Sequence, residues 1–146
     1  MRAGPELSLV EDYLARANAS GRALALGPLD IVEIDERKAR DCALQNQRLR
    51  GALPEGGTCI ALDERGKAQT SPQFAQSLAR MRDEGCPHLT LLIGGADGLD
   101  GETRGCADRL LSFGPMVWPH MLVRVMLAEQ LYRAVSILAG SPYHRA

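Results

Sequence analysis

The feature that most constrains the fold is an apolar segment that runs directly into a pair of glycines. The segment Leu89–Ile93 has the length of a strand, and Gly94-Gly95 follows it without a break. A strand with so little polar alternation is typical of a central position in a parallel sheet, where helices cover both faces. The pattern therefore predicts an α/β fold in which ligands bind beyond the carboxyl ends of the strands.

Helices and strands alternate along the rest of the chain. Apolar spacing and the positions of glycine and proline predict helices over 7–20, 36–53, 71–84, 102–108 and 121–139, and strands over 29–34, 58–62 and 110–113. Ser71 is the predicted N-cap of the helix 71–84, because Pro72 fits the first helical position. Strands joined by helices imply a parallel sheet flanked by helices. The length of 146 residues suits one domain, 1–146.

The glycine-rich loop from Gly94 to Gly101 is the strongest chemical signal in the chain. Its four glycines let the backbone approach a ligand closely. The dinucleotide pattern G-x-G-x-x-G fails because Ala96 stands at the second glycine position, and the P-loop pattern fails because no lysine follows. Taken alone, the loop is as compatible with a simple turn as with a ligand site.

Metal binding is not expected from this sequence. The acidic residues of the loop lack the spacing of a calcium-binding loop and are typical partners of a helix start: Asp97, Asp100 and Glu102. The cysteines are too far apart for a C-x-x-C motif: Cys42, Cys59, Cys86 and Cys106. We interpret them as free thiols of a cytoplasmic protein.

The charge balance limits how the chain could bind nucleic acid. With 17 basic and 18 acidic residues the net charge is −1, so there is no general attraction for polyanions or anionic membranes. Contact with RNA must then rest on local groups. One candidate is the basic helix that carries Arg37, Lys38, Arg40, Arg48 and Arg50, for which a solvated face is the alternative.

A second candidate for RNA contact is the chain's end, which we expect to be mobile. Tyr143, His144 and Arg145 combine an aromatic ring, an imidazole and a guanidinium there. Such groups can stack on an unpaired RNA base and bind its phosphate. Histidines of this kind are more often structural, so the residues alone do not decide between these roles.

The helix 121–139 is apolar on nearly all sides. A surface helix with one buried stripe does not explain that pattern, so a second subunit is expected to cover the excess. Arg124, Glu129 and Arg133 interrupt the helix, which argues against a membrane span.

Three sequence blocks resemble one enzyme family closely. These are Leu91–Leu99, Trp118–Ala134 and Ser141–Arg145, in this order and spacing. They look like the signature blocks of the bacterial 23S rRNA pseudouridine-N3 methyltransferases, which are SPOUT-class enzymes. The resemblance is dense from Leu89 to Arg145 and looser upstream.

This resemblance implies a SPOUT-type α/β knot, a C-terminal trefoil knot that binds S-adenosylmethionine. It also implies a cytoplasmic homodimer that methylates N3 of a pseudouridine in 23S rRNA, on free rRNA, the large ribosomal subunit or the assembled ribosome. Members of the family begin with a short apolar strand that ends in Val-Gly upstream of the position of Gly4-Pro5-Glu6, whereas this chain starts at Met1-Arg2-Ala3. The first strand of the sheet is therefore expected to be missing, or the start site to be wrongly assigned.

Carried over by position, the resemblance assigns three sets of site residues. The cofactor set is Leu62, Gly94, Gly95, Gly114, Pro115, Met116, Val117, Trp118 and Pro119. The candidates for handling the acceptor's proton and charge are His120, Arg124 and Arg133. The nucleotide clamp is Tyr143, His144 and Arg145.

Two other functions compete with methyl transfer. One is a catalytically inactive module that binds rRNA or the ribosome. The other is a nucleotide-binding α/β protein, which the failure of both phosphate-loop patterns already disfavours. Cofactor binding separates an enzyme from the inactive module.

Overall fold

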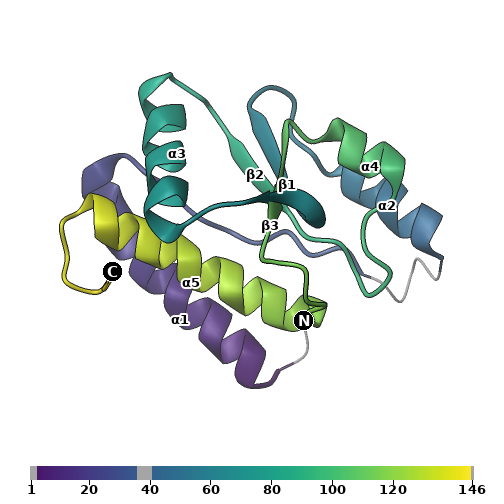
Figure 1. Cartoon of the computed structure of the whole chain (residues 1–146), viewed down its shortest axis with the longest axis horizontal. Helices are drawn as coiled ribbons and strands as arrows, with labels where there is room; N and C mark the ends of the chain where they lie inside the picture. Colours follow the sequence, from purple (N-terminus) through teal and green to yellow (C-terminus); the bar gives the residue numbers. More distant parts are fainter. Residues whose placement is uncertain (1–2, 36–40, 146) are drawn as a thin grey trace. The chain divides into compact units, whose positions relative to one another are not determined.

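The computed structural model describes residues 3–35 and 41–145. In chain order its elements are α1 (Pro5–Gly21), η1 (Arg22–Leu24), α2 (Cys42–Gly51), β1 (Thr58–Ala68), α3 (Ser71–Asp83), β2 (Leu89–Leu92), α4 (Gly101–Cys106), β3 (Arg109–Ser112) and α5 (His120–Leu138) (Figure 1). They fall into two compact units. The first comprises Met1–Val32, Thr70–Gly85 and Met121–Ala146, and the second Glu33–Gln69 and Cys86–His120.

The sheet lies in the second unit and is parallel, as the sequence predicts. Its order in the described residues is β2-β1-β3, with Ile60 opposite Leu91 and Leu62 opposite Leu111. The prediction that 89–93 forms the central strand is wrong, because β2 is at the edge and β1 is central. Apolar composition alone does not distinguish an edge strand from a central one, and β2 is only partly buried over its first three residues.

The helices α2 and α4 cover one face of this sheet (Figure 1). A buried cluster joins the sheet to the glycine-rich loop: Cys59, Ala61, Leu92 and Leu99. Partly buried side chains from the surrounding elements pack against that cluster: Leu49, Leu53, Ala107 and Leu110. Leu99 thus fixes the far end of the loop to the same core as the strand that precedes it.

The strand β1 continues past its predicted end at Leu62. Its pairing with β3 breaks after Leu62 and resumes at Lys67, so residues 63–66 form a bulge. At Gly66 a Cβ atom would lie 2.5 Å from the carbonyl carbon of Leu110. Only glycine permits this close approach of the two backbones.

In the first unit, the helix α3 begins with a capping box. The hydroxyl of Thr70 accepts from the Gln73 amide at 3.2 Å, and the Gln73 side chain accepts from the Thr70 amide at 2.9 Å. The N-cap is therefore Thr70, and the prediction of Ser71 is wrong by one residue. Thr70 is the N-cap because Gln73 stands three residues later and completes the reciprocal pair of hydrogen bonds.

The helices of the first unit are joined by polar and aromatic contacts. Tyr13 of α1 and Tyr132 of α5 have ring centroids 6.2 Å apart, and the Arg16 guanidinium lies 5.9 Å from the centre of the Tyr132 ring. Between α3 and α5, the Ser71 hydroxyl donates to Gln130 at 2.7 Å. None of the helices in residues 3–35 and 41–145 is both long and apolar enough to cross a membrane.

Two predicted elements differ from the structure. The segment 29–34 is β-branched but is not a strand, and its side chains Ile31 and Val32 are 49% and 74% exposed. Strand propensity needs a neighbouring strand, and none of the described strands pairs with this segment. The helix predicted over 36–53 begins at Cys42, because Asp41 is extended and caps it by accepting from the Leu44 amide.

The remaining predicted helices and strands are confirmed to within a few residues. Of the predicted basic helix, Arg37, Lys38 and Arg40 lie outside the described residues, whereas Arg48 and Arg50 lie on α2.

Candidate functional site

The residues assigned to the cofactor come from the strand β1 and from the segments that follow its two neighbours, β2 and β3. Leu62 ends the regular pairing of β1 with β3, Gly94 and Gly95 follow β2, and Gly114 follows β3. The strands are parallel, so their carboxyl ends share one edge of the sheet. The fold therefore brings these three segments to the edge where α/β proteins bind ligands.

The glycine-rich loop folds back on itself at its start. Gly95 and Gly98 form an isolated antiparallel bridge, and the Gly98 amide donates to the Gly95 carbonyl at 3.0 Å. A Cβ atom on Gly94 would lie 2.8 Å from the carbonyl carbon of Gly98. A side chain at position 94 would thus force the turn open.

The segment after β3 presents apolar side chains to the outside. The exposed fractions are 70% for Met116, 89% for Val117 and 41% for Trp118. At its start, the Gly114 amide donates to the Ser112 hydroxyl at 3.0 Å. Apolar groups this exposed are typical of a surface that a ligand or another protein covers.

Acidic residues at the end of the loop stabilise the N-terminus of α4, as their position in the sequence predicts. Asp100 is the N-cap and accepts from the Thr103 amide at 2.8 Å. This hydrogen bond, together with that of the Thr103 hydroxyl, holds the pKa of the Asp100 carboxyl below its ordinary value. The described residues contain no group of three or more histidine, cysteine or acidic side chains arranged to hold a metal ion.

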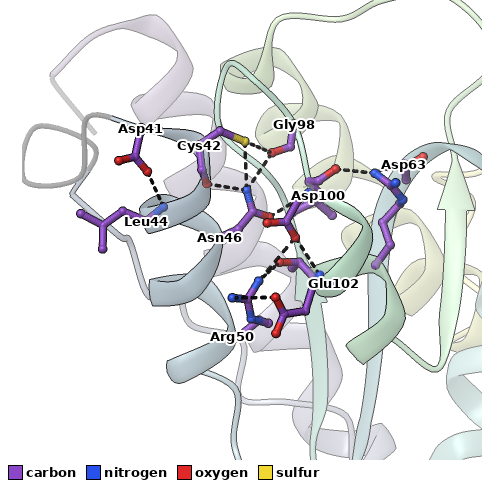
Figure 2. A network of polar contacts seen from close by, with 12 residues as sticks. Asp41, Cys42, Leu44, Asn46, Arg50, Asp63, Gly98, Asp100 and Glu102 are labelled. Carbon is purple, nitrogen blue, oxygen red and sulfur yellow. Dashed lines mark hydrogen bonds and ion pairs between the residues drawn. The ribbon is translucent and has the colours of Figure 1, made fainter.

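Arg50 of α2 binds this acidic end of the loop. Its guanidinium donates to the Thr103 hydroxyl at 2.8 Å and lies 3.4 Å from Asp100 and 3.5 Å from Glu102 (Figure 2). These contacts pair the positive charge of Arg50 with acidic side chains of the protein itself. Arg50 therefore has a structural partner in place of the phosphate that a basic helix face would contact.

The candidates for handling the acceptor's proton and charge lie on α5. His120 is its first residue, Arg124 follows one turn later, and both are half-buried and interact with neighbouring groups. Arg133 donates to Glu129 through Nε at 2.9 Å and Nη2 at 2.6 Å. This hydrogen bonding to Glu129 raises the pKa of the Arg133 guanidinium, which stays protonated.

The end of the chain is docked on α5 and is not the mobile arm that we expected. The Tyr143 hydroxyl donates to Glu129 at 3.0 Å, and the Tyr143 ring lies 4.6 Å from that of Tyr132. The Arg133 guanidinium covers the Tyr143 ring at 4.8 Å, and its Nη1 lies 3.1 Å from Nδ1 of His144. Aromatic stacking and charge-assisted hydrogen bonds together outweigh the entropy of a free end.

Glu129 is the site residue that sequence reasoning missed. The sequence pattern presents it only as a charge that interrupts an apolar helix. Its spacing of four residues from Arg133 did indicate an ion pair on one helix face. Nothing local, however, indicates that Tyr143 would complete the group.

Comparisons with known proteins identify the family of this chain. Residues 1–144 match the family model described as "Predicted SPOUT methyltransferase". Two proteins named ribosomal RNA large subunit methyltransferase H, from Dinoroseobacter shibae and Roseobacter denitrificans, are each 59% identical over 145 residues. The protein of that name from Ruegeria pomeroyi is 57% identical. Each alignment covers 99% of this chain and 93% of the relative. The chain belongs to the SPOUT methyltransferase family.

Proposed function

We propose that this protein uses S-adenosylmethionine to methylate N3 of a pseudouridine in 23S rRNA. The observation that carries the proposal is the meeting of Leu62, the glycine-rich loop and the segment 114–119 at one edge of the sheet, in a chain of this family. The relatives named as large-subunit rRNA methyltransferases support the choice of substrate.

The residues at this edge suit the proposed cofactor. The segment Gly114–Pro119 carries no charged side chain, so it offers backbone groups and apolar surface to an adenine and a methionine chain. Gly94 and Gly95 let the loop backbone approach the same molecule. When bound, S-adenosylmethionine supplies an electrophilic methyl group.

The protein's own residues have to hold the acceptor and remove its proton. Methyl transfer from a sulfonium requires alignment more than covalent help. We assign His120 as acceptor of the N3 proton, and Arg124 or Arg133 as the cation that favours the N3 anion. Because Arg133 already shares its charge with Glu129, its effect on an anion is smaller than that of an unpaired guanidinium.

The docked tail is the proposed nucleotide clamp. Tyr143 and His144 are half-buried on α5, whereas Arg145 is exposed. In this arrangement Tyr143 fixes the path of the tail, and Arg145 is placed to bind a phosphate. With a net charge of −1, such local groups have to position the rRNA.

Three further features complete the proposal. The two compact units work as a single SPOUT domain, 1–146. The protein acts as a homodimer, which covers the apolar side chains that one copy leaves exposed, including Val117 and Leu122. The reaction takes place in the cytoplasm, on the rRNA of the large subunit.

The test is mass spectrometry of 23S rRNA from a strain that lacks the protein and from the same strain complemented with it. We expect one methylated pseudouridine to disappear and to return on complementation. Unchanged rRNA would contradict the proposal. If the purified protein binds ribosomes but shows no affinity for S-adenosylmethionine in calorimetry, the inactive ribosome-binding module becomes the better account.

A further inference from the structure

The side-chain amide of Asn46 is fully buried and binds the second half of the glycine-rich loop, residues 98–101. It lies on α2 and is 1% exposed. Its Oδ1 accepts from the Asp100 amide at 3.0 Å, and its Nδ2 lies 3.4 Å from the Gly98 carbonyl oxygen. The same Nδ2 donates to the Cys42 carbonyl at 2.8 Å, which ties the loop to the first turn of α2. Figure 2 shows this amide between the helix and the loop.

Side chains hold the backbone of three successive loop residues in this region. Asn46 holds Gly98 and Asp100, and the Arg104 guanidinium donates to the carbonyl of Leu99 between them. The Leu99 side chain is buried in the core. The backbone of residues 98–100 is therefore held in one conformation.

This fixed segment, residues 98–100, contacts the glycines assigned to the cofactor. Gly98 pairs with Gly95 across the turn and lies against Gly94. A shift of the Gly98 backbone would therefore move both glycines. The Cys42 thiol approaches the same carbonyl, with its Sγ 4.0 Å from the Gly98 oxygen.

We propose that Asn46 is a positioning residue for the cofactor, because it sets the backbone of the loop on which Gly94 and Gly95 lie. The inference rests on the proposed function, since it concerns the S-adenosylmethionine site at that loop. Asn46 needs both ends of its amide for this role, one as donor and one as acceptor. Arg50 supports it from the same helix by holding Asp100 and Thr103.

The experiment compares Asn46→Leu with a matched variant, Asn18→Leu. Asn18 also clamps a backbone segment with both ends of its amide: it accepts from the Leu29 amide at 2.6 Å and donates to the Leu29 carbonyl at 3.0 Å. Leu29 belongs to none of the segments assigned to the cofactor. The two variants therefore lose the same kind of interaction, but only one of them loses it at the loop.

Calorimetry measures the Kd of S-adenosylmethionine for each full-length variant, at a temperature where thermal unfolding shows the protein to be folded. We expect Asn46→Leu to raise the Kd about tenfold or more, as the loss of a buried polar partner implies, and Asn18→Leu to change it less than about twofold. Amide hydrogen exchange supplies a second readout: exchange at Asp100 should accelerate in Asn46→Leu and not in Asn18→Leu.

An unchanged Kd in folded Asn46→Leu would overturn the inference, and so would equal losses of affinity in both variants, because these would reflect stability alone. If Asn46→Leu does not fold, Arg50→Met decides: weaker binding supports the inference and unchanged binding overturns it. If the wild-type protein does not bind S-adenosylmethionine, the proposed function itself fails, which is a distinct result.

Discussion

Tyr143 donates its phenolic hydroxyl to Oε1 of Glu129 at 3.0 Å and thereby closes the last residues of the chain onto α5. The same carboxylate oxygen accepts two hydrogen bonds from Arg133. One acidic side chain thus organises both a proposed catalytic residue and the proposed nucleotide clamp. A nucleotide that binds this tail would therefore meet side chains that are already docked on α5.

The first prediction concerns pH. Burial, followed by the hydrogen bond to Glu129, raises the pKa of Tyr143 from 10.0 to about 12. Between these values the folded state keeps a proton that the unfolded state releases, so the contribution of Tyr143 to stability is complete below pH 10 and is lost as the pH rises to about 12. We expect the free energy of unfolding of the wild type to approach that of Tyr143→Phe over this range.

Absorbance at the tyrosinate band, measured as the difference between wild type and Tyr143→Phe, checks the assignment directly. The missing chromophore should titrate near pH 12. A difference spectrum that titrates near pH 10 would show that the Tyr143 hydroxyl is solvated in solution. At neutral pH, Tyr143→Phe should lower the free energy of unfolding by about 1 kcal/mol, the net value of one hydrogen bond.

The second prediction concerns the tail as a whole. Removal of residues 143–146 should spare the binding of S-adenosylmethionine and reduce methylation of ribosomes about a hundredfold or more, because the phosphate contact of Arg145 and the docked side chains that position it are lost together. Arg145→Ala should have a smaller effect, because it leaves the docked Tyr143 and His144 in place. A truncated enzyme that works at the full-length rate would place rRNA recognition elsewhere.

The third prediction concerns the glycine-rich loop. Gly95→Val should abolish binding of S-adenosylmethionine without unfolding the protein, because a branched side chain would occupy the space proposed for the cofactor. Gly105→Val is the control, since a Cβ at Gly105 meets nothing within 4 Å. Calorimetry gives both affinities. Wild-type affinity in a folded Gly95→Val protein would locate the cofactor at another place.

The fourth prediction is that the purified protein is a homodimer. In the first half of α5, Leu122 is 41% exposed and the buried positions begin only at Leu127. The exposed apolar surface that the sequence pattern indicates therefore lies in the first half of α5. Light scattering should give twice the chain mass of 15.8 kDa at micromolar concentration. A monomer mass would contradict both the dimer and any site shared between subunits.

Much of the fold follows from local signals in the sequence. The helix α5 and the strand β2 lie within one residue of their predicted bounds, because apolar spacing and flanking glycine or proline act over a few residues. The family can be identified from the sequence for a similar reason, because each of its signature blocks is a contiguous segment. Where a local signal requires a distant partner, prediction is weaker. The segment 29–34 has the composition of a strand, but none of the described strands pairs with it.

The sequence by itself determined the α/β class, the family and the segments assigned to the cofactor. Only the tertiary structure decided that β1 is central, that Arg50 is committed to Asp100 and Thr103, and that Tyr143 is bound to Glu129. The amide of Asn46 is the clearest case, because its loop partners lie 52 and 54 positions later in the chain. A buried polar group must find a partner, but its identity depends on which backbone the fold brings within hydrogen-bonding distance.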